Sequence, residues 1–157
     1  MLEGQEIEAI FGFCYIHHFA EINEVLQEQT MIFVNEISEI VHSSIDKFNG
    51  NVNKNLGDCF LVAWKINKKS YEKDRDKILE LIEDDSKKSN EQNQFLYNKN
   101  CRNYYSDCAV TAYLTILKKI YKSKTILKYR KDERLIKKLG PNFKIEMGMG
   151  VRLIYNI

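Results

Sequence analysis

The sequence lacks several features of membrane and metal proteins. No apolar run approaches the ~20 residues that a membrane helix needs, and the acidic first residues contain no apolar signal core. The four cysteines, Cys14, Cys59, Cys101 and Cys108, form no Cys-x-x-Cys pair and no Cys/His spacing typical of zinc. These absences predict a cytoplasmic chain with reduced thiols, no zinc and no direct membrane insertion.

A strong charge of one sign is also missing. The 157 residues include 24 basic and 22 acidic side chains, so a net charge of +2 gives no long-range field toward nucleic acid. The basic run Lys118–Lys138 is interleaved with apolar residues, as in a helix with a solvated face, and no base-reading motif accompanies it. The length fits a single domain over residues 1–157 that needs no cross-links to bury its core.

Hydrophobic patterning predicts the elements in order. A buried strand over 8–16 is followed by helical spacing over 22–48, with a break near Gln29-Thr30 and a stop at Asn49-Gly50. Two short strands, 51–56 and 59–66, flank the turn Leu56-Gly57-Asp58, where Gly57 can take a positive φ.

The second half begins with a polar segment over 67–104, which predicts an insertion with one short helix near 78–82. Because this segment has few apolar groups, we expect contact with another chain to order it. A helix over 109–121, a short helix within 124–138 and a strand over 143–155 complete the pattern.

The order β-α-β-β-α-β predicts an α+β, ferredoxin-like (palm-type) fold, with helices on one face of an antiparallel sheet. In this topology the first two strands run parallel with the third between them. The end of the first strand and the turn between the next two then lie on one rim, which brings Tyr15 close to Asp58.

Four segments in this order resemble a class III adenylyl/guanylyl (nucleotidyl) cyclase catalytic domain. They are Phe11–Phe19, the helical Glu24–Ile37, the hairpin Asn53–Asp58 and the strand Phe143–Val151. The resemblance implies a site in which two carboxylates hold two divalent ions that bind a triphosphate and activate the ribose 3′-hydroxyl. Asp58 matches one carboxylate, but Tyr15 stands at the other and is a poor Mg²⁺ ligand. Asp58 is therefore either a vestigial metal position or only a turn residue.

The resemblance also implies nucleotide-binding positions. Lys54 matches the base-reading lysine of adenylyl cyclases, although a solvated lysine is also common on an edge strand. The amides from Ile16 to Phe19 match the phosphate loop, and Gly57 lies in the hairpin turn beside it. Beyond Val151 the family carries further base-reading and transition-state residues, which have no counterpart up to Ile157.

The sequence thus predicts a truncated, degenerate and catalytically inactive cyclase-homology domain that serves as a protein-interaction or assembly module. The alternative is an adenylyl cyclase half-domain, converting ATP to cyclic AMP only with a partner cyclase domain. We expect no catalytic residue and no cofactor. Mg²⁺ or Mn²⁺ is expected only if the site is catalytically active. The expected partner is another cyclase-homology domain or a larger protein assembly. Binding of ATP is doubtful, and we expect no binding of nucleic acid. Ciliary members of the family point to an axonemal location.

Overall fold

The elements follow the order that the sequence predicts. A computed structural model describes residues 7–79 and 90–154. Its elements are β1 (Ala9–Ile16), α1 (Phe19–Leu26), the 3-10 turn η1 (Gln27–Gln29), α2 (Thr30–Lys47), β2 (Asn51–Asn55), β3 (Cys59–Lys65), α3 (Lys68–Leu79), α4 (Asn90–Lys122), α5 (Lys124–Tyr129), α6 (Glu133–Leu139) and β4 (Met147–Ile154). The expected α+β class and ferredoxin-like order are confirmed.

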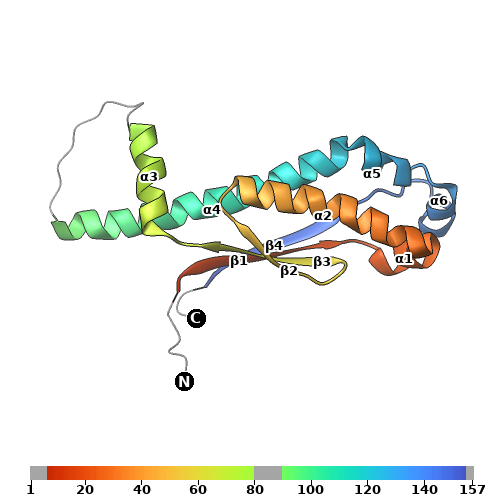
Figure 1. The fold of residues 1–157 in the computed structure, drawn as a ribbon, viewed down its shortest axis with the longest axis horizontal. Helices are drawn as coiled ribbons and strands as arrows, with labels where there is room; N and C mark the ends of the chain where they lie inside the picture. The colour runs from red at the N-terminus through yellow and green to blue at the C-terminus, as the bar shows by residue number, and fades with distance from the viewer. Residues whose placement is uncertain (1–6, 80–89, 155–157) are drawn as a thin grey trace, which may run out of the picture.

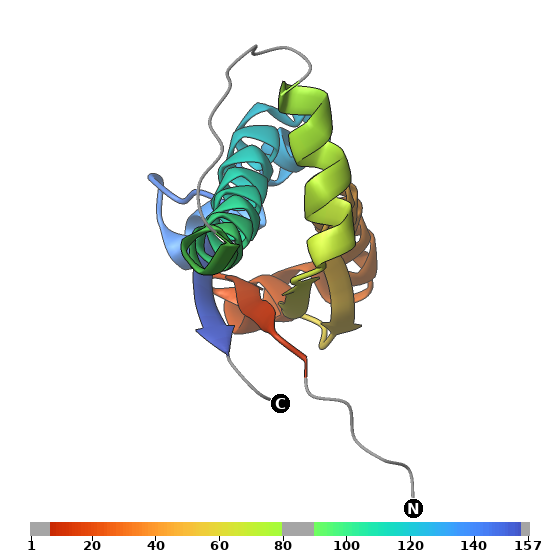
Figure 2. The same ribbon diagram turned by 90° about the vertical axis from the view of Figure 1, so that its left-hand side faces the viewer.

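The four strands form one antiparallel sheet in the order β2-β3-β1-β4. Because β1 and β2 are both antiparallel to β3, they run parallel to each other with β3 between them, as expected. The helices pack on one side of the sheet (Figure 1). No element of the described residues covers the other side, which we call the open face (Figure 2).

The core lies between the sheet and the helices. Alternate residues of a strand point to opposite faces, so Ile10, Cys14 and Ile16 of β1 point toward the helices and are buried. The fully buried large side chains come from every layer: Trp64, Tyr105, Phe33, Phe60, Ile22, Leu26, Ile37, Ile45, Ile116, Ile126, Leu135 and Val41. The strand that was expected to be buried has one exposed face, because Phe13 and Tyr15 are 48% and 38% exposed. In α4, apolar spacing alone does not mark the core, since Leu117 and Tyr121 are also exposed.

A tyrosine–glycine contact joins α4 closely to the sheet. The Tyr113 hydroxyl lies 3.3 Å from both the Phe13 and the Gly150 carbonyl oxygens. A Cβ atom at Gly12 would lie 2.2 Å from that hydroxyl oxygen. Residue 12 is therefore restricted to glycine by packing against α4.

The helix ends agree with the sequence in one place and differ in another. η1 separates α1 from α2 at the predicted break. At the end of α2, however, Asn49 takes the positive φ of 60°, where glycine at residue 50 was expected. Gly50 is needed for packing instead, because a Cβ there would lie 2.6 Å from Trp64 Nε1.

The polar segment 67–104 is more regular than the sequence predicts. α3 begins at Lys68, and the end of the short helix expected near 78–82 lies outside the described residues. The helix expected at 109–121 begins at Asn90, within the segment. Cys101 and Tyr105 are buried, and the Tyr105 hydroxyl donates to the Asn67 carbonyl at 3.2 Å. Burial of Cys101 within the segment, and of Tyr105 directly after it, attaches the end of the segment to the core.

Two short helices replace the single one expected within 124–138. Ser123 caps α5 by accepting from the Ile126 amide, and Asp132 caps α6 by accepting from the Arg134 amide. Among the described helices, none combines the length and apolar composition that crossing a bilayer requires.

The Gly12 contact predicts a specific pair of effects. We expect Gly12→Ala to lower the free energy of unfolding by about 1–3 kcal/mol, because the new methyl group overlaps the Tyr113 hydroxyl. Adding Tyr113→Phe removes that oxygen and should recover part of the loss, although Tyr113→Phe alone costs about 1 kcal/mol. Urea unfolding of the two single variants and the double variant measures the coupling, and strictly additive costs would contradict the contact.

Buried acids in the core predict alkaline destabilisation. Burial, followed by the charge of Cys59, raises the pKa of the Cys14 thiol to about 12, and burial also raises the pKa of the Tyr113 phenol. Between about pH 9 and 12 the unfolded chain releases the Cys14 proton that the folded chain retains. Stability should therefore fall as pH rises, by up to about 1.4 kcal/mol per pH unit for this thiol.

The variant Cys14→Ala isolates this contribution. Its free energy of unfolding, measured in urea from pH 8 to 11, should decline less steeply above pH 9 than that of the wild type. Equal slopes for the two proteins would show that the Cys14 thiol ionises alike in the folded and unfolded states.

Candidate functional site

The end of β1 and the β2–β3 hairpin meet on one rim of the sheet. Tyr15 pairs with Cys59 in the β1–β3 ladder, and the Ile16 amide donates to the Asp58 carbonyl at 2.9 Å. The backbone at position 15 is thus adjacent to the hairpin that carries Asp58. This is the relative placement that the sequence order predicts.

Asparagine and glycine, rather than Asp58, stabilise the hairpin turn. The Leu56 amide donates to the Cys59 carbonyl at 2.8 Å, and Asn55 Oδ1 accepts from the Gly57 amide at 3.0 Å. Gly57 has a φ of 85°, as predicted. Asn55 therefore supports the turn through its side chain, and both interpretations of Asp58, a vestigial metal position and a turn residue, stay predictions.

Asp58 influences the neighbouring thiol. Burial, and then the negative charge of Asp58, raises the pKa of Cys59 above its usual value. The thiol therefore remains protonated at neutral pH, although thiolate is the form that binds metal. Across the described residues, no three His, Cys, Asp or Glu side chains gather in a way that could hold a metal ion.

The Tyr15 ring lies over β4 on the open face. Its ring atoms lie 2.3–2.6 Å from where a Cβ of Gly148 would stand, so glycine at 148 makes room for the ring. The ring stacks between Phe13, at 6.4 Å between centroids, and His17, at 5.0 Å. Tyr15 therefore belongs to an aromatic row along β1, directed toward β4 rather than toward the hairpin of Asp58.

The predicted phosphate loop is partly occupied by protein contacts. Of its amides, that of Ile16 donates to Asp58 and that of His17 donates to the Glu146 carbonyl at 3.0 Å. The Ile16 side chain is buried and Phe19 packs partly against the core. α1 begins at Phe19 with Glu21 in its first turn, and that carboxylate already occupies the end of the helix that favours anions.

Lys54 lies on β2, just after an irregularity in the β2–β3 register. It pairs with Leu61, which pairs in turn with Phe13, so alternation places all three on the open face. The side chain is exposed. Exposure agrees with both interpretations of Lys54, a solvated edge lysine and a base-reading residue.

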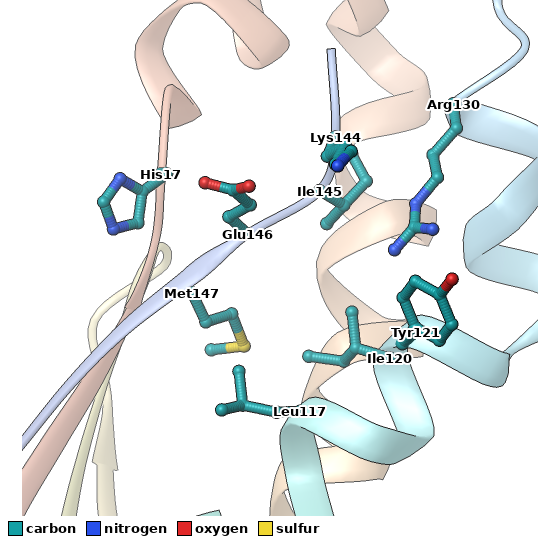
Figure 3. A pocket seen from close by; sticks show the side chains of 9 residues that line it. All are labelled: His17, Leu117, Ile120, Tyr121, Arg130, Lys144, Ile145, Glu146 and Met147. Carbon is teal, nitrogen blue, oxygen red and sulfur yellow. The ribbon is translucent and has the colours of Figure 1, made fainter. Parts of the chain in front are cut away.

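A cleft of about 460 Å³ lies next to this rim (Figure 3). It is lined by His17, Leu117, Ile120, Tyr121, Arg130, Lys144, Ile145, Glu146 and Met147. The Arg130 guanidinium lies over the Tyr121 ring, 5.3 Å from its centroid. Sequence reasoning missed this cleft, because its walls come from α4, the region after α5 and the approach to β4. The alternation of Lys144 and Glu146 with apolar residues was the one local signal.

The cations of the basic run contact the first helices. Lys128 pairs with Glu36 at 2.7 Å, Lys138 with Glu24 at 2.9 Å, and the Lys119 ammonium donates to Ser43 at 3.0 Å. Exposed pairs of this kind contribute little stability each. They nevertheless show that much of the positive charge faces acidic and hydroxyl groups of α1 and α2.

Known structures share this architecture. One structure of a bacterial light-regulated adenylyl cyclase matches with a TM-score of 0.57 and 18% identity, over 94% of this chain and 54% of the other. A second matches with a TM-score of 0.60 and 17% identity, over 99% of this chain and 32% of the other. The chain has a cyclase-like fold. It spans about half the length of the first matched chain and about a third of the second. No protein-family model and no curated protein matches its sequence.

The rim geometry predicts that a second carboxylate would create a metal site. We expect Tyr15→Asp to bind Mn²⁺ at least ten-fold more tightly than Tyr15→Asn, because the new carboxylate on β1 and Asp58 in the adjacent hairpin turn would supply hard oxygen ligands. Titration followed by Mn²⁺ electron paramagnetic resonance measures this. Adding Asp58→Asn to Tyr15→Asp should abolish the gain, and equal affinity in all three variants would show that the two positions do not converge.

Proposed function

We propose that this chain is a catalytically inactive cyclase-like domain whose role is to pair with another cyclase-homology domain. One observation carries the proposal. Tyr15 stands where the resemblance expects a metal-binding carboxylate, and its ring packs over Gly148 within an aromatic row. A two-metal mechanism needs a carboxylate ligand at both positions. This rim has the backbone arrangement, but only Asp58 supplies a carboxylate.

The open face supports a pairing role. Phe13 is 48% exposed and Tyr15 38% exposed, and both rings lie over glycines of β4. Leu61 and Lys54 continue the same face across β3 and β2. Exposed aromatic rings on a rigid sheet are the residues that protein interfaces favour. Cyclase domains of the resembled family pair head to tail, and this face is our candidate for that contact.

The alternative function is a half-site contributed to an active partner. Lys54 favours it, because it is an exposed cation on the open face at the position of the base-reading lysine. The engaged amides of Ile16 and His17 count against it, since they reduce the donors left for a triphosphate.

The decisive experiment is a cyclase assay of the purified chain with ATP or GTP and Mn²⁺. We expect no cyclic nucleotide above the enzyme-free blank, and Asp58→Asn should behave identically. Isothermal titration of ATP with and without Mg²⁺ should give no metal-dependent binding. Turnover that disappears in Asp58→Asn would overturn the proposal.

A mixing experiment tests the alternative. The chain is added to the separate catalytic domain of a bacterial light-regulated adenylyl cyclase, and cyclic AMP formation is followed. Half-site donation requires an increase in rate that is lost in Lys54→Ala and kept in Lys65→Ala, a matched exposed lysine on β3. We expect no Lys54-dependent increase.

A further inference from the structure

The cleft beside the rim has walls that are partly apolar and partly charged. Among its lining residues, Ile120 and Met147 are buried, whereas Leu117 and Tyr121 are 42% and 68% exposed. Large apolar side chains that are exposed around a concave surface are typical of a place that a ligand covers. The volume of about 460 Å³ is sufficient for a small organic molecule.

Arg130 supplies a cation to this cleft. Across the described part of the chain, no carboxylate pairs with its guanidinium, and its buried Nε atom has no hydrogen-bond partner. The guanidinium lies over the Tyr121 ring, 5.3 Å from the centroid. Stacking uses the flat face of the group and leaves the N–H donors at its edge available. Lys128 and Lys138, by contrast, already pair with carboxylates of the first helices. Arg130 is therefore a positioned cation with donors left for a ligand.

The charged groups of the cleft are unevenly distributed. Figure 3 shows Arg130 and Tyr121 on one side, and His17 and Glu146 on the other. Lys144 is exposed and adds a second cation to the lining. Two cations and one carboxylate give the cleft a positive charge, but the carboxylate repels a ligand that carries several negative charges. A ligand with one negative charge, placed at Arg130, suits this distribution best.

We infer that this cleft binds a small organic carboxylate with an apolar body. The carboxylate oxygens accept hydrogen bonds from Arg130, because the planar guanidinium matches the geometry of a carboxylate. The apolar body covers Leu117 and Tyr121 and removes their surface from water. The site is built from α4, the region after α5 and the start of β4. It therefore goes beyond the pairing role proposed for the open face and does not rest on it.

An NMR titration of the full chain with benzoate tests the inference, with the amide ¹H–¹⁵N spectrum as the readout. We expect saturable binding in the millimolar range or tighter, as a ligand of this size allows. The largest shifts should fall at 117–121 and 144–147. Failure to saturate would overturn the inference, as would shifts centred on Phe13 and Tyr15 of the open face.

Three further probes separate the contributions of charge and apolar surface. Benzamide has the shape of benzoate without its charge, and acetate has the charge without the ring. Each should bind at least about ten-fold more weakly than benzoate, because each loses one of the two contacts. Phenyl phosphate should bind no more tightly than benzoate, because Glu146 repels its second charge. Equal affinity for benzoate and either weaker probe would overturn the inference, and tighter binding of phenyl phosphate would assign a phosphate monoester instead.

Matched variants identify the residues that recognise the charge. Arg130→Gln should weaken benzoate binding at least about ten-fold, since a charge-assisted hydrogen bond is lost. Lys131→Gln removes an adjacent exposed cation outside the lining and should leave the affinity unchanged. Glu146→Gln should strengthen binding about three-fold, because it removes a repulsive charge from the cleft.

Circular dichroism establishes that each variant is folded. If Arg130→Gln unfolds, Lys144→Gln at an exposed position takes its place and should also weaken binding. Equal affinities of the Lys131→Gln variant and the variant at residue 130 or 144 would overturn the inference. Weaker binding in Glu146→Gln would overturn it as well, because the carboxylate would then be attracting the probe.

Discussion

The contact between Tyr113 and Gly12 determines how α4, β1 and β4 are arranged. The absence of a side chain at Gly12 lets the Tyr113 hydroxyl reach two strand carbonyls, each at 3.3 Å. This close approach positions α4 over β1 and β4, and it positions the apolar floor of the cleft beside the end of β1. The cleft depends on this packing distance, because its lining includes Leu117 and Ile120 of α4 as well as Met147 of β4.

Two surfaces follow from this arrangement, and they differ in chemistry. The open face carries aromatic rings packed over glycines, with Lys54 and Asp58 at the hairpin that borders it. The cleft beside the rim is lined instead by apolar side chains of α4 together with His17, Arg130, Lys144 and Glu146. The same fold can host different functions, so the role of these surfaces is argued from their side chains and not from the cyclase-like fold.

Local sequence signals predicted the elements well but their limits less well. The continuous apolar run of β1 and the 3.6-residue spacing of α2 depend on neighbours in the sequence, so both elements could be predicted directly. The beginning of α4 could not, because residues 90–104 are polar and contain few apolar markers. Cys101 and Tyr105 become core residues only when the helix is already packed against the domain. The need for glycine at residue 50 was not visible either, because it comes from the close contact with Trp64, which lies on another element.

By itself the sequence determined the order of strands and helices and placed a tyrosine, a side chain without a carboxylate, at residue 15 on the rim. It also specified Asp58 and Lys54 as the charged residues of the hairpin. Only the tertiary structure decided where the Tyr15 ring points, that Asn55 caps the turn, and that Arg130 and Lys144 share a cleft with His17. The physical reason is that residue type and spacing fix local conformation, whereas ring direction, capping and cleft formation depend on atoms brought together from distant segments of the chain.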